Sequence, residues 1–115
     1  MIDIKNNLKG HNMKTVNLIG NVTKVPHFIA GKENKKAVAY LTVANNDVKD
    51  KTVFVEVTVF GREAEYVNQN INTGARVAIE GKLSQREKTT KNGDTYKELY
   101  VSCNRLTNLS KNGEA

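Results

Sequence analysis

One stretch, residues 52–60, constrains the fold of this chain more than any other. Every odd position in it, from Val53 to Val59, is a valine, while Phe54 and Phe60 lie on the even positions with a glutamate and a threonine between them. Side chains alternate between the two faces of a β-strand, and valine favours strands. The stretch therefore predicts a strand whose valine face is buried in a core.

The two phenylalanines are left on the wetter face of that strand. Exposing such a ring forgoes roughly 1.5–3 kcal/mol of burial, so another contact should use each of them. One interpretation is that a second element or a partner subunit covers this face. The other is a stacking platform, on which flat rings receive nucleic-acid bases while nearby cations hold the phosphates.

The charge of the chain favours an anionic partner. It carries 18 Lys and Arg against 12 Asp and Glu, a net charge of +6, and nucleic acid fits this balance. An acidic membrane surface is also anionic. However, no apolar run approaches the ~20 residues of a membrane-spanning helix, and the start has no signal-peptide segment, so we expect a soluble, cytoplasmic protein with no membrane partner.

A period of two in the apolar residues predicts four further strands, and one segment changes to helical spacing. Ala64, Val67 and Ile71 recur on one face of a helix. The stretch around Pro26 is expected to be irregular or at a sheet edge, and Asn92–Gly93 predicts a hairpin turn. The expected strands are residues 14–20, 37–44, 52–60, 75–87 and 96–103, and the expected helix is residues 62–72.

Three strands, a helix and two more strands are the order of the five-stranded OB-fold barrel. At 115 residues the chain has room for one small domain. We therefore expect an all-β fold with one short helix between strands 3 and 4, although the pattern alone also allows other small barrels. The expected organisation is a flexible N-terminal arm at 1–12, an OB-fold domain at 13–107 and a frayed C-terminal end at 108–115.

The last expected strand separates its side chains by alternation. Leu99, Val101 and Cys103 are predicted to point into the core, and Glu98 and Tyr100 to point outward, together with Tyr96. Cys103 is the only cysteine of the chain, so it cannot form an internal disulfide. A buried free thiol is the favoured interpretation.

Several stretches, in this order along the chain, resemble bacterial and phage-type single-stranded DNA-binding proteins. They are Val16 to Thr23, Ala37 to Ala44, Phe54 through Arg62, and Gly74 with residues 77–83 and Arg86. The resemblance implies an OB fold that binds single-stranded DNA without strong sequence preference and protects it in replication, recombination or repair. It also implies a homo-oligomer, either a homodimer or a homotetramer, in the bacterial nucleoid.

The resemblance also assigns site residues. Phe54 falls where the family often has a stacking tryptophan, Phe60 falls on its stacking phenylalanine, and Arg62 and Arg86 fall on positions that commonly carry cations near the DNA. Together with the outward aromatics and the basic loop, the expected DNA-binding residues are Tyr40, Phe54, Phe60, Arg62, Lys82, Arg86, Lys88, Lys91 and Lys97.

The chain departs from the family pattern in three ways. It has no tryptophan, and Lys88 stands where one stacking tryptophan would be. The family's acidic tail, which recruits replication enzymes, has no counterpart in residues 110–115, so recruitment by that route is not expected. The arm at 1–12 precedes the family's usual start, which suggests a variant from a mobile element or phage.

Catalytic, metal or cofactor chemistry has little support in the sequence. His11 and His27 lie near no carboxylate cluster and are expected to be solvated loop residues, and no glycine-rich phosphate loop is present. We therefore expect a non-enzyme without metal or cofactor. Two alternatives to single-stranded DNA binding remain. One is an OB-fold module that binds RNA or assists replication, and the other is a protein-interaction module in which the phenylalanine face is an oligomer seam.

Overall fold

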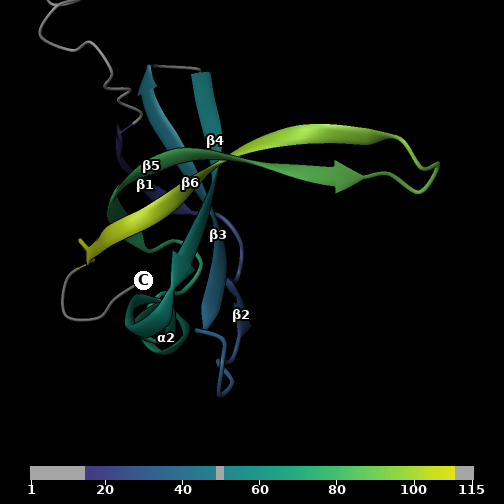
Figure 1. The fold of residues 1–115 in the computed structure, drawn as a ribbon. Coiled ribbons are helices and arrows are strands. Elements are labelled where there is room, and N and C mark those ends of the chain that lie inside the picture. Colours follow the sequence, from purple (N-terminus) through teal and green to yellow (C-terminus); the bar gives the residue numbers. More distant parts are fainter. Residues whose placement is uncertain (1–14, 49–50, 111–115) are drawn as a thin grey trace, which may run out of the picture.

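The computed structural model describes residues 15–48 and 51–110 (Figure 1). The expected arm at 1–12 and residues 111–115 of the expected frayed end lie outside this part of the chain. Within the described ranges, no helix is long and apolar enough to cross a membrane. The elements are β1 (Thr15–Val22), β2 (His27–Ile29), β3 (Val38–Val48), β4 (Lys51–Phe60), α2 (Gly61–Asn70), β5 (Arg76–Thr89) and β6 (Thr95–Asn108).

Five long strands close into a ring. Their order is β1, β5, β6, β4, β3, and β3 returns to β1 through the pairs Asn21 with Ala44 and Val22 with Val43. All neighbours are antiparallel except β4 and β6, which run parallel where Val57 pairs with Val101. The expected all-β fold, with its helix between the third and fourth long strands, is confirmed.

A sixth, short strand was not predicted. β2 pairs with the outer edge of β3, with His27 opposite Tyr40 and Ile29 opposite Val38. It begins directly after Pro26, which has no backbone N–H to donate and is therefore typical of a sheet edge. Three residues are too few for alternation to reveal, so the sequence predicted only an irregular edge here.

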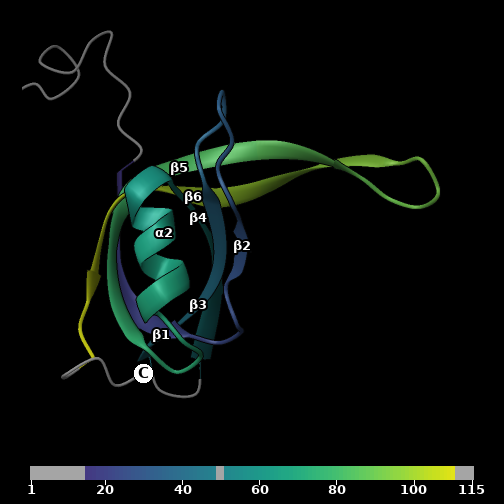
Figure 2. The same cartoon turned by 90° about the horizontal axis from the view of Figure 1, so that it is seen from below.

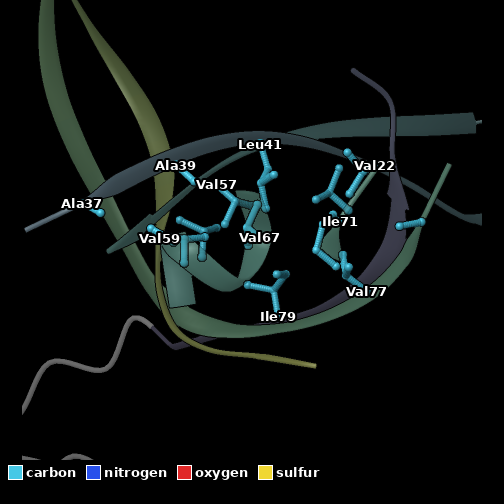
Figure 3. Packing of buried hydrophobic residues seen from close by; sticks show 14 residues of the cluster. Val22, Ala37, Ala39, Leu41, Val57, Val59, Val67, Ile71, Val77 and Ile79 are labelled. Atoms are coloured by element: carbon cyan, nitrogen blue, oxygen red, sulfur yellow. The ribbon is translucent and has the colours of Figure 1, made fainter. Parts of the chain in front are cut away.

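The core lies inside the strand ring and is closed at one end by α2 (Figures 2 and 3). Val57 and Val59 of β4 and Ile79 of β5 are almost fully buried, and Ala64 and Val67 of α2 pack against them. Ile71, directly after the helix, is buried with them, as its spacing predicted.

A glycine makes the sharp turn from β4 into α2. Gly61 has a φ of +67° and donates its N–H to the carbonyl of Ala37 at 2.8 Å. Glycine adopts this left-handed conformation at little cost, because it has no Cβ to clash with the backbone. The turn leaves Phe60 at the end of the strand and Arg62 in the first helical turn, on the outside of the ring.

Two residues that alternation assigned to the core are exposed. Val53 has 57% of its surface exposed and Leu99 has 59%. Val53 pairs with Asn45 near the outer end of the β3–β4 hairpin, and Leu99 pairs with Gln85 in the β5–β6 hairpin. Both positions keep the inward-facing side of their strand, but these parts of the strands have left the ring, so no core lies beneath them.

The β5–β6 hairpin extends far from the ring as a two-stranded ribbon (Figure 1). We call this ribbon the arm, a name that from here on does not refer to residues 1–12. Its pairs run out to Thr89 with Thr95, so both strands are longer than predicted. The turn contains the expected Asn92–Gly93 pair, and Gly93 has a φ of +90°. The arm brings outward-facing residues of β5 and β6 into a surface beside β3 and β4.

The contrast between Val57 and Val53 provides a stability test. Val57→Ala removes two buried methyl groups, so we expect a loss of about 2 kcal/mol in the free energy of unfolding. Val53→Ala is the matched control, the same substitution on the same strand side, and should cost less than about 1 kcal/mol because the side chain is already in water. Urea denaturation measures both. Equal losses would mean that both valines belong to the core.

Candidate nucleic-acid interface

The two phenylalanines of β4 lie on the outside of the strand ring. Phe54 is 63% exposed and Phe60 is 42% exposed, whereas Val57 and Val59 between them point into the core. The expected outward placement is therefore confirmed, and base stacking on these rings stays a prediction. Six residues of a strand separate the two rings by roughly 20 Å. A ligand that uses both must therefore cross the surface between them.

Tyr40 lies beside that surface on the next strand. It pairs with Thr58, so the two side chains share the outer face of the ring. On its other side, the ring of His27 stacks on the Tyr40 ring with centroids 6.0 Å apart and an angle of 25° between the planes. His27 is exposed, as expected, but the expectation of a loop is wrong, because the residue belongs to β2 and its ring lies beside that of Tyr40. His11 lies outside the described residues.

Arg86 is held between two tyrosines at the base of the arm. Its guanidinium carbon lies 4.4 Å from the centroid of the Tyr100 ring and 5.8 Å from that of Tyr40. Both distances allow cation–π attraction. Its Nη1 also donates to Thr58 Oγ1 at 3.4 Å. Thr58 is only 3% exposed, although its strand face is outward. Arg86 thus joins β5, β6, β3 and β4 across the outer surface.

Glu98 lies opposite Arg86 in the arm and pairs with two cations. Its Oε2 is 2.8 Å from Lys88 Nζ and 3.7 Å from Arg86 Nε. The hydrogen bond from Lys88, assisted by the charges of Lys88 and Arg86, holds the pKa of Glu98 below its ordinary value, although partial burial acts in the other direction. The same hydrogen bond raises the pKa of Lys88. An open hollow beside these residues is lined by Tyr40, Glu56, Arg86, Glu87 and Lys88.

The cluster formed by these contacts comprises His27, Tyr40, Thr58, Arg86, Lys88, Glu98 and Tyr100. The remaining expected cations lie at different distances from it. Lys82 pairs with Ser102 on the outer face of β5, and Arg62 is exposed in the first turn of α2. Lys91 is exposed in the turn at the tip of the arm. Lys97 pairs with Glu87, one residue away from the Arg86–Glu98 pair, so it lies on the reverse face of the arm. The structure therefore brings Tyr40, Arg86 and Lys88 together and leaves Lys91 and Lys97 apart from them.

Sequence reasoning missed four members of the cluster. Thr58, Glu98 and Tyr100 were placed outward by alternation but not assigned to the site, and His27 was assigned to a loop. The missing signal is the pairing of β5 with β6. Once the turn is centred on residue 92, Arg86 must face Glu98, as it does in the structure.

The single thiol has no part in this surface. Cys103 is half-buried at the edge of the core, and burial, with the negative charge of Glu63 nearby, raises its pKa to about 12. It therefore stays a protonated thiol at neutral pH, as a structural cysteine does. Among the described residues, no group of three or more His, Cys, Asp or Glu is placed to hold a metal ion.

The model of the single-strand binding protein family matches residues 13–109. This range contains every described strand, the helix and the Arg86–Glu98 pair.

Curated relatives agree with this match. A single-stranded DNA-binding protein of Paenarthrobacter aurescens is 33% identical over 99 residues, which is 76% of this chain and 57% of the relative. A single-stranded DNA-binding protein of Wolinella succinogenes is 29% identical over 104 residues, 84% of this chain and 64% of the relative. The chain thus spans less than two thirds of the length of either relative.

The lowered pKa of Glu98 leads to a pH prediction. A carboxyl whose pKa is lower in the folded than in the unfolded protein stabilises the fold above the unfolded pKa, near 4.5, and this contribution is lost as the pH falls through the folded value. We expect an NMR titration to place the Glu98 pKa below 4.5. Lys88→Gln should raise it, because the main hydrogen-bond donor is lost.

Lys97→Gln is the control for this titration. It removes the same charge from the reverse face of the arm, so the Glu98 pKa should change little. A wild-type pKa at or above 4.5, or a pKa that Lys88→Gln leaves in place, would contradict the assigned ion pair.

Proposed function

The chain belongs to the single-strand binding protein family, and from that membership we propose that it binds single-stranded DNA without strong sequence preference. The observation that carries the proposal is the outer face of the ring. Phe54 and Phe60 expose their rings there, and Arg86 and Lys88 lie on the adjoining surface of the arm. Aromatic rings that stack on bases, beside cations that track the backbone, are the usual means of binding single strands.

In the proposed mechanism, bases stack on Phe54 and Phe60, with Tyr40 as a weaker third ring. The strand crosses the roughly 20 Å between the two phenylalanines and passes the guanidinium of Arg86. Arg86 and Lys88, with Lys82 and Arg62, contact phosphates along this path, while Lys91 and Lys97 contribute only if the strand also wraps the arm. Because no tryptophan is present, charge contributes a larger share of the binding free energy than it does in tryptophan-rich members of the family.

The wider role follows from the family. We propose that the protein covers single-stranded DNA during replication, recombination or repair in the bacterial cell, and that it acts as a homodimer or homotetramer. Exposed leucines at positions 83 and 99 on the reverse face of the arm support self-association, because they are apolar and lie away from the proposed DNA path. Light scattering on the free protein gives the mass of the assembly.

The function is tested by titration of labelled oligo(dT) and of a duplex of equal length, followed by fluorescence anisotropy at two salt concentrations. We expect far tighter binding of the single strand, because a duplex keeps its base faces inside the stack. Phe54→Ala and Phe60→Ala should each weaken oligo(dT) binding by ~1–3 kcal/mol and change folding stability little.

Other outcomes of this titration identify the alternatives. Equal affinity for duplex and single strand would mean that the basic surface alone binds, and the stacking role of the phenylalanines would be rejected. Tighter binding of a matched oligo(U) RNA would favour an RNA-binding module. If the double variant Phe54→Ala and Phe60→Ala dissociated the assembly and kept its affinity for DNA, the phenylalanine face would be an oligomer seam.

The two faces of the arm allow a second test. Arg86→Gln and Lys97→Gln remove the same charge from the same hairpin, but on opposite faces. We expect Arg86→Gln to weaken binding to all sequences alike and to reduce the slope of log K against log salt by ~0.7, the value for one phosphate contact on a single strand. Lys97→Gln should change the slope less. Equal effects of the two variants would mean that the strand does not contact Arg86 on its path between Phe54 and Phe60.

A further inference from the structure

The carboxylate of Glu98 lies between two of the cations that are proposed to contact DNA. Its Oε2 is 2.8 Å from Lys88 Nζ and faces Arg86 Nε at 3.7 Å. Both cations belong to the surface proposed to contact DNA. An anionic oxygen between an ammonium and a guanidinium has the same chemistry as a phosphate oxygen in that position.

The pairing between Glu98 and Arg86 is incomplete. Charge-assisted N–H···O hydrogen bonds are about 2.7–2.9 Å long, and the Nε–Oε2 distance of 3.7 Å is well beyond this. The Arg86 Nε is shielded from water and has no hydrogen-bond acceptor among the described residues. A phosphate oxygen that took the place of the carboxylate could come closer to this Nε and would supply the missing acceptor.

The balance of charge at this place also indicates that Glu98 competes with a phosphate. Arg86 and Lys88 carry two positive charges, and Glu98 cancels one of them. The side chain of Lys88 is 46% exposed, so its ion pair lies at the surface, where such pairs are weak and can be exchanged. A strand that reaches the base of the arm therefore meets cations that are already partly neutralised from within the protein.

We propose that Glu98 is an internal competitor for phosphate, which holds Lys88 and Arg86 in the free protein and must yield them when a single strand binds. This inference rests on the proposed function and adds a residue that limits the affinity of that site. The competition by Glu98 also restricts which anions can bind at this site. Only a polyanion that makes several contacts at once gains enough to replace the carboxylate, so a free monovalent anion does not occupy the site.

The test is a double-mutant cycle on oligo(dT) binding at low salt. Glu98→Gln keeps the shape of the side chain and removes its charge, so we expect affinity to rise by about fivefold, the factor that corresponds to a surface ion pair. In a Lys88→Gln background the same substitution should give a gain of twofold or less, because the partner at 2.8 Å is gone and only Arg86, at 3.7 Å, remains to be released. Glu98→Thr, which suits a strand position, should reproduce the gain and guards against a folding defect of the first variant.

Glu80→Gln is the matched control. Glu80 is an exposed residue of β5, paired with Asn17 and Arg105, and lies six residues from Arg86, roughly 20 Å along the strand. It changes the net charge by the same amount but has no contact with the two cations. We expect less than a twofold gain from it.

The outcomes separate the two proposals. If wild-type protein binds oligo(dT), but Glu98→Gln and Glu80→Gln give the same gain, or the gain is unchanged by Lys88→Gln, the carboxylate acts only through long-range charge. The inference is then overturned while DNA binding stands. If wild-type protein does not bind oligo(dT), both are overturned.

Discussion

The rest of the structure depends on a short parallel contact between β4 and β6. Only Val57 with Val101 and Thr58 with Ser102 are paired there, yet without these pairs the β5–β6 hairpin would be joined to the other strands through β1 alone. The inward-facing valines of the contact are buried in the core. On the outward side, Thr58 accepts a hydrogen bond from Arg86. One contact therefore closes the ring, completes the core and places the base of the arm beside β3 and β4.

The strand ring could be predicted because alternation and helical spacing are local properties of the sequence. Val57 and Val101 were assigned to the core by their period, and both are buried. Val53 and Leu99 have the same period and are exposed. Alternation tells which side of a strand a residue faces, but not how far along the strand the core extends. That limit is set by where the hairpins leave the ring, which is a property of the assembled sheet.

The candidate site was predicted in its outline and not in its connections. Phe54 and Phe60 were found because large rings on a polar strand face require an explanation, and Arg86 because of a family resemblance. The environment of Arg86 comes from residues that are distant in the sequence, with Tyr40 on β3 and Glu98 on β6. Only the pairing of the arm strands could have indicated Glu98 in advance. No local pattern indicates that the buried hydroxyl of Thr58, on β4, would be the third neighbour of Arg86.

The arm and the ring differ in their stability against local unfolding. Residues 87–97 are exposed on both faces, and a two-stranded ribbon without a packed layer is only marginally stable in water. The strands of the ring share one core and unfold together, whereas the ladder of the arm can open pair by pair from its tip. Arg86 and Glu98 lie where this fraying end meets the cooperative body. The contacts of Arg86 with the two tyrosines and Thr58 lie at this boundary, so an opening that starts at the tip must break them before it reaches the ring.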